Sequence, residues 1–110
     1  MKDVNEYILQ QNESCMDFLQ RALGGQVNAK TIKMMDVLLE IIITEISDSD
    51  HSLTLRREVG GIDIIISHSG KAIKDDMMGI IEDQVDRLYY RHLSKDSHTL
   101  KISKKNKSVT

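Results

Sequence analysis

Residues 34–46 read MMDVLLEIIITEI, the longest apolar stretch in the sequence. Asp36, Glu40 and Glu45 interrupt it, and it is shorter than the ~20 apolar residues that a membrane-spanning helix needs. Its apolar positions recur at the i, i+3, i+4, i+7 spacing of a helix, at Met35, Leu38, Leu39, Ile42 and Ile46. Because Val37, Ile41 and Ile43 add apolar surface outside this stripe, we expect a core helix buried on more than one side.

The composition is that of an ordinary soluble domain, with 110 residues of which 40% are hydrophobic and 29% charged. A net charge of −2 argues against a general nucleic-acid binder. The single cysteine, Cys15, excludes an internal disulfide, and the polar N-terminus does not look like a secretory signal. We therefore expect one cytoplasmic, non-membrane domain over residues 1–104, followed by a basic, disordered tail over residues 105–110.

Two helices are predicted in the first half of the chain. Residues 3–23 form an amphipathic pattern that Gly24 and Gly25 end. Its apolar stripe consists of Val4, Ile8, Cys15, Phe18, Leu19 and Ala22. Cys15 is therefore expected to be a core residue. Asn28 is a suitable N-cap for the second helix, which should run to about Ser47.

After Ser52 the pattern changes to the strict alternation of β-strands. The alternating apolar residues are Leu53, Leu55, Val59, Ile62, Ile64 and Ile66. Gly60 and Gly61 divide them into two runs, which predicts a β-hairpin. Ile65 lies on the otherwise polar face of the second run, so we expect this face to be covered or to form an interface.

A third helix should begin near Lys74 or Asp75 and continue along a stripe that ends at His92. That stripe consists of Met78, Ile81, Val85, Leu88 and His92. A last strand is expected over residues 98–103. The order helix, helix, strand, strand, helix, strand predicts an α+β, two-layer sandwich, in which about three helices pack on a small, mostly antiparallel sheet.

Few residues form a recognisable chemical motif. The four histidines, which are His51, His68, His92 and His98, lack metal-ligand spacing. Asp63, Ser67 and His68 lie on one predicted strand, where neighbours point to opposite faces, so they do not form a triad. Glu40 and Glu45 lie among aliphatic residues, where a carboxylate with a raised pKa can act as a base or metal ligand. Alternatively, they lie on the exposed edge of the helix and pair with Lys or Arg.

The order of these pieces resembles a known enzyme domain. EIIITEI on a helix, a hairpin running into ISHSGKAI, a helix with MMGIIEDQVDRLYY and a strand TLKISK follow one another. This order resembles the ATPase domain shared by histidine kinases, type II topoisomerases and Hsp90 (the GHKL group). It is most similar to the bacterial anti-sigma-factor serine kinases, over about residues 34–104. The resemblance implies a role in signal transduction.

The resemblance implies site residues in this chain, with departures from the family pattern. In the family, the long helix carries a catalytic Glu and a magnesium-binding Asn, and an Asp-x-Gly-x-Gly segment after the second strand reads adenine. Glu40 matches the catalytic Glu, but Glu45 stands near the place of the Asn. His68 replaces the adenine-reading Asp, and Gly70 matches the first glycine after it.

The glycines of the strand-end motif and of the phosphate-binding pair are also incomplete. Ala72 replaces the second glycine of the strand-end motif. Gly79 matches one glycine of the pair that opens the next helix in the family, and Met77 stands in place of the other. The segment between Ile73 and Gly79 is too short for a nucleotide lid. The resemblance therefore implies a degenerate ATP site.

Three functions follow as hypotheses. The first is a non-catalytic regulatory or protein-interaction module, without cofactor, that binds a protein partner and forms a homo-oligomer. The alternative is a divergent kinase that binds Mg-ATP and uses Glu40 as its base, with His68 or Asp63 contacting adenine. Nucleic-acid binding through the basic tail and Arg56, Arg57, Arg87 and Arg91 is disfavoured by the acidic net charge.

Overall fold

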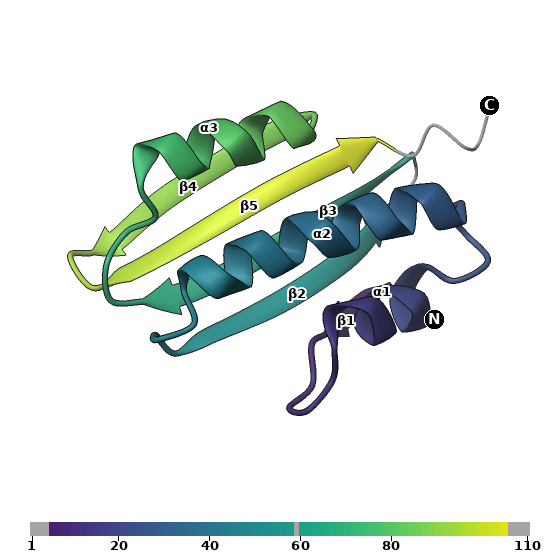
Figure 1. The fold of residues 1–110 in the computed structure, drawn as a ribbon, viewed down its shortest axis with the longest axis horizontal. Coiled ribbons are helices and arrows are strands. Elements are labelled where there is room, and N and C mark those ends of the chain that lie inside the picture. The colour runs from purple at the N-terminus through teal and green to yellow at the C-terminus, as the bar shows by residue number, and fades with distance from the viewer. Residues whose placement is uncertain (1–4, 59, 106–110) are drawn as a thin grey trace.

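The computed structural model describes residues 5–58 and 60–105. Within these ranges, three helices lie on one face of a five-stranded sheet (Figure 1). The strands are β1 (Glu6–Ile8), β2 (His51–Glu58), β3 (Gly61–Ser69), β4 (Arg87–Ser94) and β5 (Ser97–Lys105). The helices are α1 (Cys15–Leu23), α2 (Ala29–Glu45) and α3 (Asp75–Gln84). Every strand pair is antiparallel, in the order β1-β2-β3-β5-β4, which confirms the predicted α+β sandwich.

The central helix α2 is present as predicted. The side-chain oxygen of Asn28 accepts a hydrogen bond from the backbone N–H of Thr31 at 2.8 Å, which caps the helix. Its buried residues, which are Ile32, Met35, Leu38, Leu39 and Ile42, belong to the same core cluster as the apolar residues of β2, β3 and β5. The expected burial on more than one side is wrong for Val37, whose side chain is 54% exposed. In the described part of the chain, no helix is long and apolar enough to cross a membrane.

The predicted helix over residues 3–23 is wrong over the described residues 5–14, where β1 pairs with β2 and the chain then reverses. Asn12 has a φ of 70° at this reversal, and the helix begins only after its N-cap, Ser14. Arg21 holds the reversal closed, because its guanidinium donates to both carboxylate oxygens of Glu13 at 2.9 Å and to the carbonyl of Ile8 at 2.8 Å. Val4 of the predicted stripe lies outside the described residues.

The hairpin of β2 and β3 is confirmed. Gly60 turns the chain with a φ of 79°, a backbone conformation that glycine adopts without steric cost. Leu55 and Ile64 are paired in register, with both side chains buried under the helices. Val59 and residues 106–110, which include most of the predicted basic tail, lie outside the described residues.

The third helix is confirmed only up to Gln84, and its predicted continuation through His92 is wrong. Residues 87–94 form β4 instead, paired with β5 at the sheet edge. Leu88 and Tyr90 are half-buried toward the core and alternate with exposed neighbours, which is the repeat of a strand. The expected last strand is also confirmed, as β5.

Candidate functional site

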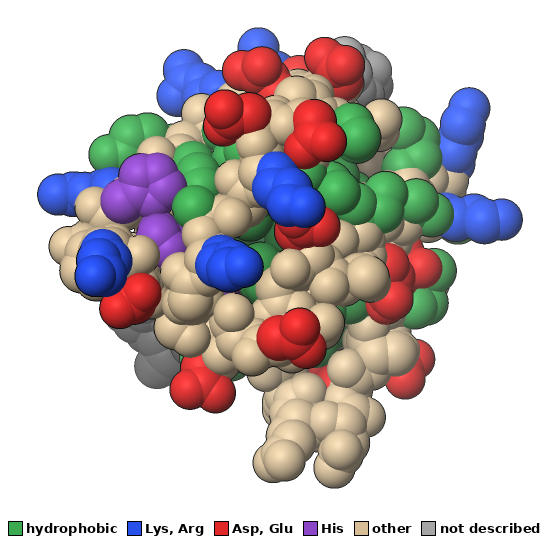
Figure 2. Space-filling view, turned by 60° about the vertical axis from the view of Figure 1, so that its left-hand side comes forward, with side chains coloured by type: hydrophobic (Ala, Val, Ile, Leu, Met, Phe, Trp, Pro, Cys, Tyr) green, Lys and Arg blue, Asp and Glu red, His purple; other side chains and the backbone are tan. Residues whose placement is uncertain are grey.

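All four histidines of the sequence lie in one row across the sheet. The strand registers place His51 beside His68, His68 beside His98, and His98 beside His92. The row crosses the end of β3 from which the chain leads to α3, and Figure 2 shows histidine side chains close together there. The sequence alone suggested scattered histidines, because strand register, not sequence spacing, brings them together.

His68 is held in one neutral form by its neighbours. It is 3% exposed, and its Nδ1 lies 3.2 Å from the carbonyl oxygen of Ser69. Since a carbonyl only accepts, Nδ1 carries the proton, and Nε2 accepts from the Tyr90 hydroxyl at 2.9 Å. The same hydroxyl oxygen accepts the backbone N–H of Ile73 at 2.9 Å. Burial lowers the pKa of His68, which favours this neutral ring.

His98 and His92 form a second hydrogen-bonded pair. Nε2 of the buried His98 donates to the carbonyl of Gly70 at 2.8 Å, so its Nδ1 is left as an acceptor. Nδ1 of His92 lies 2.7 Å away and therefore donates to it. This pair offers two nitrogen ligands, fewer than the three protein ligands of a catalytic zinc site. Its clear role is to hold the backbone of Gly70.

The two glycines that the resemblance matches, Gly70 of the strand-end motif and Gly79 of the pair under the phosphates, have different environments. Gly70 has a φ of 81°, and its N–H donates to the carbonyl of Asp96 at 2.9 Å. A Cβ at Gly70 would lie 2.8 Å from Oγ of Ser49, so both the turn and the packing require glycine there. Gly79 lies inside α3, with no atom within 4 Å of the position of a Cβ. Neither glycine opens a helix.

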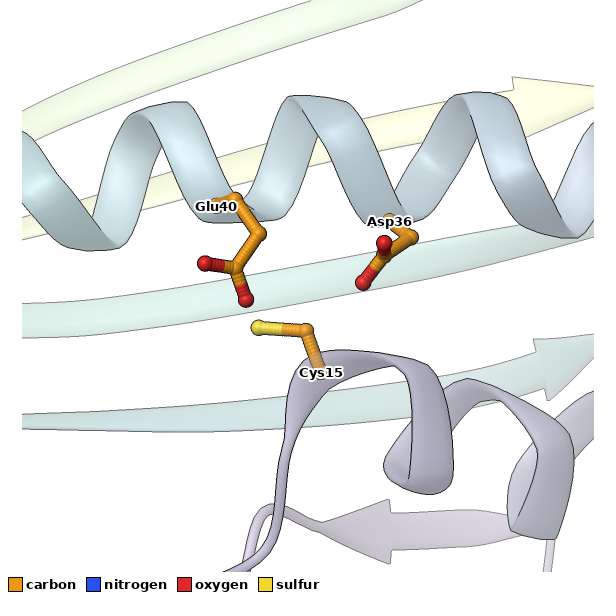
Figure 3. A group of neighbouring side chains, drawn as sticks. All are labelled: Cys15, Asp36 and Glu40. Atoms are coloured by element: carbon orange, nitrogen blue, oxygen red, sulfur yellow. The ribbon is translucent and has the colours of Figure 1, made fainter.

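The two glutamates of α2, Glu40 and Glu45, also lie in different surroundings. Glu40 lies on the side of α2 that faces α1, where its carboxylate and that of Asp36 approach the thiol of Cys15 (Figure 3). Ligand atoms of these three residues lie within 4.8 Å of one another. Glu45 is exposed in the last turn of α2. The structure therefore brings Glu40 together with Cys15, which sequence reasoning had not connected with it.

The thiol of Cys15 is unreactive at neutral pH in this arrangement. Burial raises its pKa to about 12, and the hydrogen bond to Glu40 and the charges of Glu40 and Asp36 act in the same direction. Because the thiolate is the nucleophile and the metal ligand, a protonated Cys15 at neutral pH does neither chemistry. Cys15 is thus a core residue, as predicted.

Four hollows are lined by the described residues, and none of the four is lined by a histidine. Two that border α2, lined among others by Met35, Leu38 and Lys104, each have a volume of about 10 Å³. A small-molecule site usually needs about 300–1,000 Å³. Hollows of about 350 and 420 Å³ lie at the Gly61 end of β3, away from His68.

Exposed apolar side chains occur on both sides of the molecule. On the helical side, Met34 and Val37 of α2 and Ile80 of α3 are about half exposed. Figure 2 shows apolar side chains gathered in a band on the surface, with carboxylates around it. On the side of the sheet without helices, Ile8 and Tyr89 are exposed. Such surfaces are typical of sites that bind other proteins.

A scan against protein-family models and a search of curated proteins found no match. The function of the chain therefore has to be inferred from its own residues.

Proposed function

We propose that this chain is a non-catalytic protein-interaction module, built on a histidine-kinase-like ATPase scaffold that has lost its nucleotide chemistry. The observation that carries the proposal is the environment of His68, the residue at the place of the adenine-reading Asp. A carboxylate there accepts a hydrogen bond from the amino group of adenine. Nδ1 of His68 is a donor, and the lone pair on Nε2 is taken by the Tyr90 hydroxyl. His68 has no acceptor left for adenine.

The positions of the two matching glycines and of the catalytic Glu support the same proposal. The amide of Gly70 is used by the carbonyl of Asp96, and Gly79 lies within α3 rather than at its start. Glu40 faces Cys15 of α1. A nucleotide would therefore have to break several internal contacts before it made any of its own, and each hydrogen bond broken costs free energy.

The partner surface that fits best is the helical side around Val37 and Ile80. Val37 is 54% exposed and Ile80 is 49% exposed. Every charged residue of α3 is acidic, at Asp75, Asp76, Glu82 and Asp83. An apolar surface beside an acidic helix favours a partner that is apolar and basic, such as a basic amphipathic helix laid along this side.

The first experiment separates this proposal from the kinase alternative. Isothermal titration with Mg-ATP should give no binding, and Mg-ATP should not shift thermal unfolding. A nucleotide present at a hundred times its Kd would add about 2.7 kcal/mol to the free energy of unfolding. Micromolar Mg-ATP binding that Glu40→Gln weakens would overturn the proposal in favour of a kinase.

The second experiment tests the partner surface with two designed helical peptides, one built from Leu and Lys and the other from Leu and Glu. Fluorescence anisotropy should detect binding of the Leu/Lys peptide and much weaker binding of the Leu/Glu peptide. Val37→Asp should weaken the Leu/Lys complex about tenfold, because it places a charge in the apolar contact. Gln20→Asp is the matched control, since it adds the same charge on an exposed site of α1. Equal effects of the two substitutions would contradict this surface.

A further inference from the structure

The face of the sheet that carries no helix has an ordered pattern of side chains. β3 is the middle strand, with β2 and β1 on one side and β5 and β4 on the other. Register places one residue of each strand in a single row across this face, namely Ile8, Thr54, Ile65, Lys101 and Tyr89. Ile65 is half-buried and Tyr89 is 58% exposed. The row is therefore largely apolar at its centre and at both ends.

Charge on this face is divided between its two halves. The β5–β4 half carries basic residues, which are Arg87, Arg91, Lys101 and Lys105. On the other half, Glu6 of β1 lies in the same row as Arg87 of β4. Each of these two residues is two strands away from β3, on opposite sides of it. Glu58 and Lys105 likewise flank Gly61 on either side of β3. Glu6 and Glu58 of the β1–β2 half thus mirror Arg87 and Lys105 across the middle strand. Glu6 also pairs with Arg56 of its own half at 2.9 Å, and Asp63 of the middle strand pairs with Lys101 at 3.8 Å.

We propose that this face binds a second copy of the chain, sheet against sheet, about a two-fold axis that runs along β3. This axis places β1 over the partner's β4, and β2 over the partner's β5. Ile65 then meets Ile65 of the partner subunit, and Ile8 meets Tyr89 of the partner subunit. Glu6 lies opposite Arg87 of the partner subunit. Charge complementarity of this kind makes the face complementary to itself, as a two-fold interface requires.

The size of the face sets the expected strength of the dimer. Five strands ~4.8 Å apart, each rising ~3.3 Å per residue, cover roughly 19 by 27 Å, or about 500 Å² per subunit. A standard stable interface uses about 800 Å² per partner, so this dimer belongs to the weak class. We therefore expect a monomer–dimer equilibrium that depends on concentration in the micromolar range. This inference goes beyond the proposed function and uses the opposite side of the molecule.

Sedimentation equilibrium over a range of concentrations tests the dimer. The wild-type chain should shift from monomer to dimer, and Tyr89→Lys should raise the Kd about tenfold or more, since the apolar contact of Tyr89 with Ile8 of the partner subunit is replaced by a charge. Val37→Asp, on the helical side, should leave the Kd unchanged. Urea unfolding of each variant shows whether the fold is kept. Because Tyr89 is exposed, we expect Tyr89→Lys to change the free energy of unfolding little.

A charge exchange tests the position of the axis. Glu58→Lys and Lys105→Glu should each raise the Kd, and the double variant should return it toward the wild-type value, because the opposite charges face each other again. The same exchange at Glu82 and Lys33, both exposed on helices, is the control and should have no effect.

Three results would overturn the inference. They are a monomer up to about millimolar concentration, a dimer that Tyr89→Lys does not weaken, and a double exchange that is weaker than both single variants. Each leaves the proposed function intact, because peptide binding at Val37 is measured separately and should persist in the monomeric Tyr89→Lys variant.

Discussion

Replacing Tyr90 with phenylalanine tests the hydrogen-bonded cluster at the end of β3. The substitution removes one oxygen atom and leaves the ring, so the packing against His68 and His98 is kept. That oxygen donates to Nε2 of His68 at 2.9 Å and accepts from the N–H of Ile73 at 2.9 Å. Tyr90→Phe therefore leaves two partners without their hydrogen bonds.

The expected loss follows from the burial of these partners. His68 and Ile73 are both buried, so water replaces the lost hydroxyl poorly at either site. An unsatisfied buried donor or acceptor costs about 1–3 kcal/mol. Two such groups predict a fall of about 2–6 kcal/mol in the free energy of unfolding, which is a large part of the ~5–15 kcal/mol of a typical domain.

Urea unfolding at pH 7.5 measures this loss as a lower midpoint with an unchanged m-value. Tyr89→Phe is the matched control, because Tyr89 is its exposed neighbour on β4 and should change stability by less than about 0.5 kcal/mol. Amide hydrogen exchange of Ile73 should also become faster in Tyr90→Phe only. The reasoning is refuted if both tyrosine variants are equally stable and the Ile73 amide exchanges as in the wild type.

Three further predictions concern single residues. Gly70→Ala should destabilise the protein by more than about 1 kcal/mol, because Gly70 has a positive φ and a Cβ there would contact Ser49. Gly79→Ala should instead stabilise α3 by up to about 1 kcal/mol, and thermal unfolding compares the two variants directly. Cys15, which is buried and has a pKa of about 12, should react with a thiol reagent at pH 8 only as fast as the protein opens, and equal rates in folded and urea-unfolded protein would contradict this. The pKa of His68 is lowered in the folded state, so at acidic pH the unfolded state binds more protons than the folded state. The contribution of neutral His68 to stability is therefore complete above pH 6.5 and declines as the pH falls below 6.5. Urea unfolding of His68→Gln between pH 7.5 and 5 should show a shallower pH dependence than that of the wild type.

The parts of the fold that were predictable have strong local signals. α2 has a long helical repeat with an N-cap at Asn28, and the β2–β3 hairpin has alternation on both sides of Gly60. Residues 3–14 and 85–92 were predicted as helix because their apolar residues also fit a helical stripe. Pairing with a distant strand decides their structure instead, since β1 depends on β2 and β4 depends on β5.

The candidate site was less predictable, because its residues meet through strand register. The hairpin turn at Gly60 fixes His51 opposite His68, and this part was within reach of the sequence. The neighbouring His98 required the pairing of β3 with β5, and His92 required β4 to be a strand at all. The meeting of Glu40 with Cys15 depended in turn on how α1 packs on α2, which no local pattern specifies.

The end of β3 also shows how this part of the fold is held in place without a ligand. A site that binds a nucleotide keeps donors and acceptors free until the ligand arrives, which costs stability in its absence. Here Tyr90 and the carbonyl of Ser69 occupy both nitrogens of His68, and His98 occupies the carbonyl of Gly70. Because these groups are satisfied within the chain, the loop that leads to α3 is fixed by the protein itself. The proposed interaction module requires such a ligand-independent shape, because it works by presenting surfaces to other proteins.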